Sequence, residues 1–198
     1  RTQRAEDNFM NGPIKPPPAD SFVSLPPVGS AEYERRVAVG EQALREGRVA
    51  LLVLAGGMAT RMGGVIKALV DAIPGESFLD LRRAEMRSIE RRYGMAPPLW
   101  LMTSHSTDAG IRQALGDDLD GESIATFTQH LSLRVTPKGD VFFDKRGQPS
   151  EHAPGHGDLP DALRESGLLA AFVKRGGQVI LMSNIDNMGG TLDPAGIG

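Results

Sequence analysis

The stretch Val49–Lys67 constrains the fold more than any other part of the chain. It starts with an uninterrupted apolar run, Val49–Ala55, and then changes abruptly to Gly56-Gly57. Such a run is typical of a strand that is buried on both faces of a parallel sheet. The sequence therefore predicts an α/β fold that is built around this strand.

A glycine-rich loop with two cations follows the strand. A second pair, Gly63-Gly64, comes after the first, with Arg61 between the pairs and Lys67 just beyond. Glycine lets the backbone approach an anion and direct N–H groups at it, while Arg and Lys supply charge. The spacing matches neither a Walker A loop nor the dinucleotide pattern. The loop is a candidate phosphate site, although a glycine turn facing water would have the same composition.

Composition narrows the possible functions. The chain has 198 residues, a formal net charge of −3 and no cysteine. The weak negative charge disfavours nucleic acid as a partner. Without cysteine there are no disulfides, thiolate zinc sites or cysteine nucleophiles. No segment approaches the length of a membrane span, so we expect no membrane partner and a soluble, cytoplasmic protein.

The rest of the chain is predicted to alternate between helices and strands. Residues 1–30 are rich in proline and predict an arm, and residues 31–198 predict a nucleotide-binding domain. In the second helix the arginines are expected to lie mostly off the apolar face. The predicted helices are Ala31–Glu46, Phe78–Tyr93, Ser106 or Thr107 to Leu115, and Asp158–Lys174, the last with a capping box; the predicted strands are 49–55, Leu99–Met102, Ile124–Thr128 and Gln178–Met182, with a hairpin over 133–144.

This order predicts a mostly parallel sheet flanked by helices, with right-handed crossovers. Ligands of such sheets bind beyond the carboxyl ends of the strands. Two of those ends carry conspicuous loops, at residues 56–64 and 183–190. We expect the functional site where these two loops meet.

The glycine loop also carries a family resemblance. Leu54–Gly63, followed by Lys67, resembles the signature loop of sugar-nucleotide pyrophosphorylases. Ala59 stands where that family usually has a third glycine, and Ile66 where a proline usually precedes the lysine. The resemblance implies a Rossmann-like nucleotidyltransferase fold of GT-A type, with nucleotide held by Leu54, Ala55, Gly56, Gly57 and Lys67.

A second motif, Pro154–Leu159, contains His156 four residues after His152. That spacing could join two metal ligands on a helix, but proline and glycine exclude a helix here. A turn in which Asp158 caps the next helix is the simpler interpretation. The string Pro-Gly-His-Gly-Asp is similar to that of UTP–glucose-1-phosphate uridylyltransferases. The similarity implies that Gly155 contacts uracil and that His156 lies against the substrate phosphates.

The third motif, Ser183–Gly189, follows the last predicted strand. On composition alone it is an Asx-rich turn. A carboxylate at the carboxyl end of a strand can also hold Mg²⁺, which takes oxygen ligands together with substrate phosphates. The string resembles the Asn-x-Asp-Asn-Leu-Gly motif of the same uridylyltransferases, which implies that Asp186 binds the metal and Asn184 the sugar phosphate.

Two weaker matches stand in the same order along the chain. Leu101–Ser104 with Thr107 resembles the family's Met-x-Ser-x-x-Thr segment, and Phe127-x-Gln129 resembles its Phe-x-Gln. The second match implies that Gln129 reads the uracil edge, for which an amide offers one donor group and one acceptor. All five matches lie between about residues 51 and 193.

The resemblance implies an enzyme that converts UTP and glucose 1-phosphate into UDP-glucose and pyrophosphate with Mg²⁺. Lys67 would stabilise charge at the α-phosphate, and Arg61 would contact the leaving pyrophosphate. The chain is expected to be the N-terminal part of the catalytic domain, incomplete at its C-terminal side. Two alternatives stay open: a pyrophosphorylase for another sugar 1-phosphate, and a non-catalytic module that binds UTP or a UDP-sugar.

Overall fold

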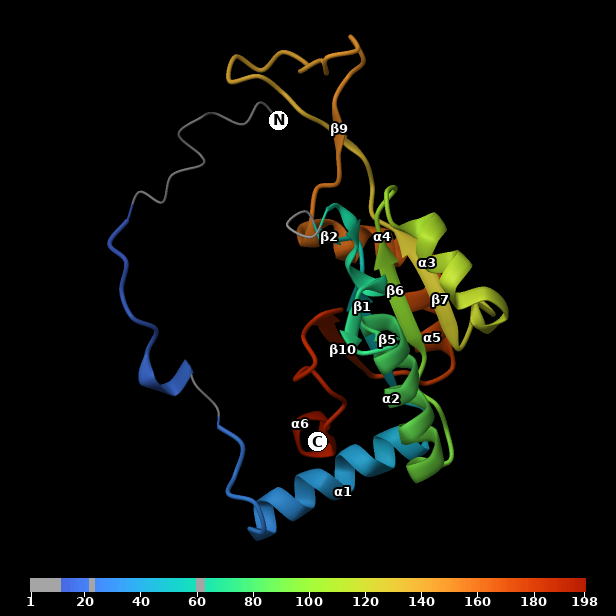
Figure 1. The fold of residues 1–198 in the computed structure, drawn as a ribbon. Helices are drawn as coiled ribbons and strands as arrows, with labels where there is room; N and C mark the ends of the chain where they lie inside the picture. Colours follow the sequence, from blue (N-terminus) through green and yellow to red (C-terminus); the bar gives the residue numbers. More distant parts are fainter. Residues whose placement is uncertain (1–11, 22–23, 60–62) are drawn as a thin grey trace.

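A four-stranded parallel sheet forms the centre of the computed structural model, which describes residues 12–21, 24–59 and 63–198. The strands are β1 (Val49–Leu54), β6 (Leu99–Thr103), β7 (Ile124–Thr128) and β10 (Val179–Asn184), in the order β10-β1-β6-β7. Figure 1 shows β1 and β6 side by side at the centre of the body. The predicted mostly parallel α/β sheet is confirmed.

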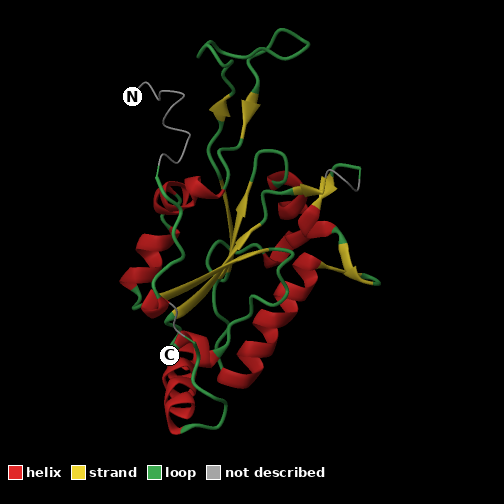
Figure 2. Cartoon of the chain, turned by 90° about the vertical axis from the view of Figure 1, so that its left-hand side faces the viewer, coloured by secondary structure: helices red, strands yellow, loops and turns green. Residues whose placement is uncertain are grey.

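Helices cover both faces of the sheet, as Figure 2 shows. The side chains of β1 alternate between two apolar cores: Leu51 and Val53 enter one, and Leu52 and Leu54 enter the other. Because each face is covered, the strand is apolar throughout and buried along its whole length. The first core is covered by α1 (Ala31–Arg45), α2 (Phe78–Tyr93) and α3 (Asp108–Leu115), and the second by α4 (Leu159–Glu165) and α5 (Leu168–Lys174).

Side-chain caps fix where the longer helices begin. In α2 the Ser77 hydroxyl accepts from the Asp80 N–H, and the Asp80 carboxylate accepts from the Ser77 N–H at 3.0 Å. Gly94 ends this helix in the left-handed region at φ 83°. Ser30 caps α1 by accepting from the Tyr33 N–H. Both helices begin at the predicted residues.

The single helix predicted over Asp158–Lys174 is wrong. The chain forms α4 and α5, which are separated at Gly167, a residue with φ 79°. The Asp158 side chain makes no capping hydrogen bond and Asp161 completes no capping box, because the Asp158 carboxylate is bound to His130. The glycine conformation therefore divides a segment whose apolar residues alone favour one helix.

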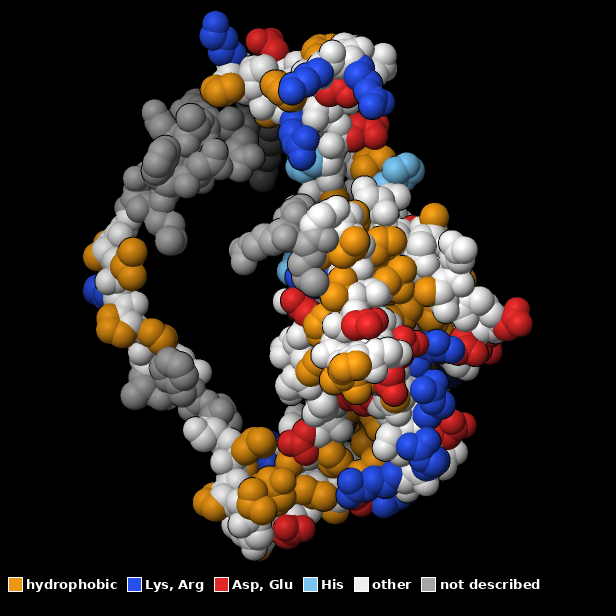
Figure 3. All heavy atoms as spheres, viewed as in Figure 1, with side chains coloured by type: hydrophobic (Ala, Val, Ile, Leu, Met, Phe, Trp, Pro, Cys, Tyr) orange, Lys and Arg blue, Asp and Glu red, His pale blue; other side chains and the backbone are white. Residues whose placement is uncertain are grey.

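The hairpin predicted over residues 133–144 is only part of a longer ribbon. Strand β8 (Ser132–Leu133) pairs antiparallel with β9 (Glu151–His152), and isolated bridges join Val135 to Val141 and Phe143 to Pro149. Figure 2 shows this ribbon projecting from the body. Apolar and basic side chains share its surface, as Figure 3 shows. The predicted pairing within residues 133–144 is present, and the ribbon is longer because pairing continues through residues 149–152.

The last strand, β10, is an edge strand instead of a fully buried one. Its Met182 side chain is 54% exposed, because only β1 pairs with this strand in the described sheet. The described part of the arm contains one turn of 3-10 helix, η2 (Ala19–Ser21). No helix in the described ranges is long and apolar enough to cross a membrane. The remaining short elements are β2 (Met58–Ala59), β3 (Val65–Ile66), η4 (Lys67–Leu69), β4 (Asp71–Ile73), β5 (Glu76–Ser77), η5 (Gly116–Asp118), η6 (His156–Asp158) and α6 (Pro194–Ile197).

Candidate functional site

The glycine loop forms a small hairpin at the carboxyl end of β1. Strand β2 pairs with β3 through Met58–Ile66 and Ala59–Val65, and the Lys67 N–H donates to the Gly57 carbonyl at 3.2 Å. The hairpin thus returns the chain to its starting point and places Lys67 beside Gly57. Both glycines of the second pair have positive φ, 84° and 77°, which explains why glycine is needed there.

Ile66 anchors this hairpin to the body. Its side chain is partly buried against the first core, and it lies where a side chain on Gly110 of α3 would have to be. Because Gly110 has no side chain, Ile66 can pack closely against α3, and this apolar contact holds the base of the hairpin. This packing gives a physical role to a residue that departs from the family pattern.

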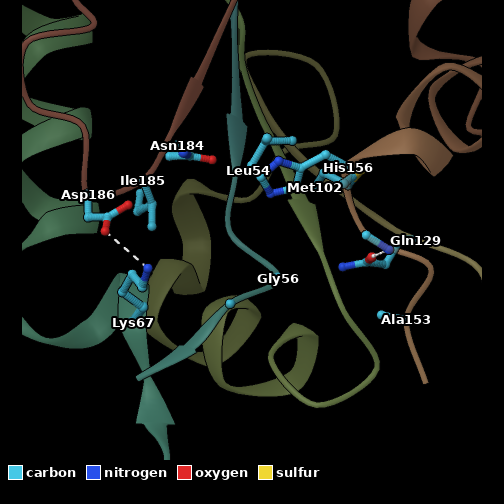
Figure 4. A pocket seen from close by; sticks show the side chains of 12 residues that line it. Leu54, Gly56, Lys67, Met102, Gln129, Ala153, His156, Asn184, Ile185 and Asp186 are labelled. Carbon is cyan, nitrogen blue, oxygen red and sulfur yellow. Dashed lines mark hydrogen bonds and ion pairs between the residues drawn. The ribbon is translucent and has the colours of Figure 1, made fainter. Parts of the chain in front are cut away.

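The three motifs meet at a cavity of about 350 Å³ above the carboxyl ends of the strands. Its volume is in the range of small-molecule sites. Figure 4 shows Lys67 and Asp186 on one side of the cavity, with Gln129 and Ala153 on the other. The residues that line it are Leu54, Gly56, Gly57, Lys67, Met102, Gln129, Ala153, Gly155, His156, Asn184, Ile185 and Asp186.

One described residue expected at the site from the sequence, Ala55, is not part of this lining. Ala55 is fully buried, and its N–H donates to the Met102 carbonyl at 2.8 Å, so it continues the sheet beneath the cavity. Arg61 lies outside the described residues. The other nine residues expected at the site all line the cavity: Leu54, Gly56, Gly57, Lys67, Gln129, Gly155, His156, Asn184 and Asp186.

Lys67 and Asp186 form an ion pair on one side of the cavity, with Lys67 Nζ 3.0 Å from Asp186 Oδ2. Both side chains are partly exposed, so the pair contributes little to folding. It instead presents one cation and one carboxylate to the same small space. A polyphosphate with a bound cation needs both charges.

On the opposite side, Gln129 is held in a defined orientation. Its Oε1 accepts from the Gly155 N–H at 3.3 Å, and its side chain is almost completely buried. A Cβ on Gly56 would overlap Gln129 Nε2, so the glycine leaves room for that amide group. The geometry fixes the amide with its donor end beside Gly56.

The sequence interpretation missed Arg82, although it lies at the centre of the support for Asp186. The Arg82 side chain is 0% exposed and donates to the Asn187 and Gly190 carbonyls, at 2.5 and 3.0 Å, and to Glu85 at 2.8 Å. It therefore ties α2 to the loop that follows β10. Its position is three residues after Leu79 and four before Met86, so helical periodicity itself places it on the apolar face.

Among the described residues that line the cavity, Asp186 is the one carboxylate that could bind a cation. No group of three or more His, Asp or Glu side chains within the described ranges is arranged to hold a metal ion. Among the described residues Asp186 Oδ1 has no hydrogen-bond partner, while Oδ2 faces Lys67. A single carboxylate suits Mg²⁺, which keeps several waters and takes its other oxygens from substrate phosphates. The residues present fit such an ion.

Comparison with known sequences connects this site to one family. The family described as UTP–glucose-1-phosphate uridylyltransferase matches residues 2–197. UTP–glucose-1-phosphate uridylyltransferase 2 of Dictyostelium discoideum is 33% identical over 91% of this chain. The aligned part is 36% of that protein, so the chain spans about a third of the relative's length.

Solved structures share the fold. UDP-N-acetylglucosamine pyrophosphorylase of Trypanosoma brucei superposes with a TM-score of 0.72 and 25% identity, over 83% of this chain and 37% of the other. UDP-glucose phosphorylase of the same organism superposes with a TM-score of 0.68 and 26% identity, over 78% of this chain and 34% of the other. The nucleotidyltransferase fold expected from the motifs is confirmed.

Proposed function

Because the chain belongs to the UTP–glucose-1-phosphate uridylyltransferase family, we propose that it supplies the nucleotide site of an enzyme that makes UDP-glucose. The reaction joins UTP to glucose 1-phosphate and releases pyrophosphate. The observation that carries the proposal is the convergence of the glycine hairpin, Gln129, the Gly155–His156 turn and the Asn184–Asp186 loop on one cavity.

Different parts of the cavity lining would bind the uracil base and the phosphates. Gln129 and Gly155 would receive the uracil, and the backbone of Gly56 and Gly57 would approach the phosphates. Asn184 would contact the sugar phosphate, and His156 would lie against the nucleotide or the sugar phosphate, since both residues line the cavity. This arrangement brings two anionic substrates together in one orientation, which is the main requirement of phosphoryl and nucleotidyl transfer.

The chemical step is an in-line displacement. An oxygen of the sugar phosphate attacks the α-phosphorus of UTP, and the bond from that phosphorus to the oxygen bridging the α- and β-phosphates breaks. Lys67 would stabilise the negative charge that develops on the α-phosphate. When bound at Asp186, Mg²⁺ would neutralise phosphate charge as a Lewis acid. No covalent intermediate with the protein is needed.

Calorimetric titration with UTP, beside an assay for UDP-glucose, tests the proposal. The 198-residue chain is expected to bind UTP with Mg²⁺ and to bind it more weakly when the cation is chelated. UTP binding without turnover would favour the non-catalytic alternative. No binding of UTP to the chain would contradict the proposed site.

The sugar is the second part of the proposal. Glucose 1-phosphate follows from the family to which the chain belongs. A panel of sugar 1-phosphates that includes N-acetylglucosamine 1-phosphate tests it, and the largest kcat/KM is expected for glucose 1-phosphate. A cytoplasmic location is also part of this proposal, and cell fractionation tests it.

A further inference from the structure

The Gly155–Asp158 turn, which carries two cavity residues, is bound at both ends by the two residues that follow β7. Gln129 and His130 follow β7 directly. Gln129 accepts from the N–H of Gly155, and His130 binds the carboxylate of Asp158. His156 lies between these two anchors and lines the cavity.

His130 holds Asp158 with two separate groups. Its main-chain N–H donates to Asp158 Oδ2 at 2.6 Å, and its ring Nδ1 lies 2.7 Å from Oδ1. Both carboxylate oxygens are therefore bound to one residue. The Asp158 side chain is nearly buried, and in this arrangement it makes no capping bond to α4. The carboxylate fixes the turn instead of the helix.

The other ring nitrogen completes a three-residue cluster. His130 Nε2 lies 2.9 Å from Glu165 Oε2, at the end of α4. Two carboxylates thus face the two ring nitrogens, and only an imidazolium can donate to both. Asp158 from η6 and Glu165 from α4 are the charged groups that the described structure places against the ring.

We propose that His130 is a positioning residue for nucleotide binding, which holds the Gly155–Asp158 turn against Gln129 through Asp158. The inference rests on the proposed function, since the turn matters through the nucleotide that Gly155 and His156 would contact. His130 itself does not line the cavity. Its effect reaches the ligand only through the turn.

The charge of His130 makes this role pH-dependent. Hydrogen bonding to Asp158, then to Glu165, raises the pKa of His130 from 6.5 to about 9. Although burial raises the pKa of Asp158, its bonds to His130 lower that pKa overall. A raised pKa means that the attraction is fully present below 6.5 and is lost as the pH rises through about 9. The contact between the charged His130 ring and Asp158 is therefore present at neutral pH.

The test compares UTP affinity across pH in the wild-type chain and in His130→Ala. The variant is expected to bind UTP about tenfold more weakly at neutral pH, as loss of a charge-assisted hydrogen bond would cause. The wild-type affinity should fall toward that of the variant as the pH passes about 9. Because the two proteins differ only at residue 130, the difference between the two profiles isolates His130.

Two further variants sharpen the comparison. His130→Arg keeps the main-chain bond and a charged donor, so it should retain most of the affinity and lose the transition near pH 9. His105→Ala, an exposed histidine after β6, is the matched control and should behave as wild type. Equal affinities and equal pH profiles for wild type and His130→Ala would overturn the inference.

Hydrogen exchange of the unliganded chain separates this inference from the proposed function. The Gly155 amide donates to Gln129, so its exchange should accelerate in His130→Ala and stay slow in His105→Ala. Unchanged exchange in His130→Ala would overturn the holding role without any reference to UTP. A wild-type chain that binds no UTP overturns the proposed function and, with it, the effect of His130 on affinity.

Discussion

Lys67 Nζ donates to Asp186 Oδ2 at 3.0 Å, although 119 positions separate the two residues along the chain. The hairpin after β1 delivers the lysine, and the loop after β10 delivers the carboxylate. The two strands are neighbours in the sheet, so their carboxyl ends meet at one place. This contact joins the two loops where the sequence predicts the site.

Lys67→Ala should lower the rate of UDP-glucose formation by about 10²–10³-fold, because it removes one preorganised charge from the site. The measurement is kcat in the protein that carries this chain, with Lys174→Ala as the control. Lys174 is exposed at the end of α5 and should leave the rate unchanged. A Lys67→Ala protein with the wild-type rate would refute the role given to this lysine.

Gly56→Ala should weaken UTP binding by about tenfold or more, since the added methyl group overlaps the Gln129 amide. Discrimination between UTP and CTP should fall as well, because the amide is displaced from the base. Gly57→Ala is the comparison variant, because its added methyl group would lie 3.8 Å from Lys67 Cε and would not overlap the Gln129 amide. Base discrimination that survives in Gly56→Ala would show that the amide does not read the base.

Arg82→Met should destabilise the fold by about 3–5 kcal/mol, because it leaves Glu85 and two loop carbonyls without their partner. Urea unfolding at neutral pH measures the loss. Arg91→Ala, on the exposed side of the same helix, should change the unfolding free energy by no more than about 0.5 kcal/mol. Similar values for the two variants would contradict the support that Arg82 gives to the Asp186 loop.

Ser77→Ala should cost about 1 kcal/mol of stability at neutral pH, because it removes the cap of α2. The bond from Ser77 is the main reason why the pKa of Asp80 is lowered from 3.8. A lowered pKa gives stability that is present above 3.8 and is lost as the pH falls through the folded-state value. The difference between wild type and variant should therefore shrink in acid.

Unfolding by urea at neutral pH and at about pH 3 checks this dependence. Ser88→Ala, on the exposed side of α2, is the control and should show no such change between the two conditions. A Ser77→Ala deficit that is equal at both pH values would show that Asp80 does not contribute to the cap.

The central strand and the starts of the helices could be predicted because local chemistry decides them. The apolar run at β1 fits a strand that is covered on both faces, and Ser30 and Gly94 mark helix ends through hydrogen bonds to nearby backbone. The cavity residues were found from motifs whose order along the chain follows the order of the strand ends. Those features need no knowledge of distant contacts.

The errors occur where distant residues decide the structure. Asp158 looks like a helix cap in sequence, but His130 from another strand end takes its carboxylate. The periodicity of α2 places Arg82 on the apolar face, but the carbonyls that accept from its guanidinium belong to the distant loop after β10. The position of β10 at the sheet edge depends on strand order, which the apolar pattern of one segment does not reveal.

The place of β10 beside β1 also bears on how the protein comes to be folded. It is the last strand of the sheet along the chain, and its register pairs Val49 with Val179 and Leu54 with Asn184. During synthesis, the hairpin with Lys67 leaves the ribosome long before Asp186 does. Pairing across so long a separation carries a large loop-closure entropy and is slow. The cavity is therefore completed only after β10 has joined the sheet, so a nascent chain that ends before residue 179 would hold the glycine hairpin without its acidic partner.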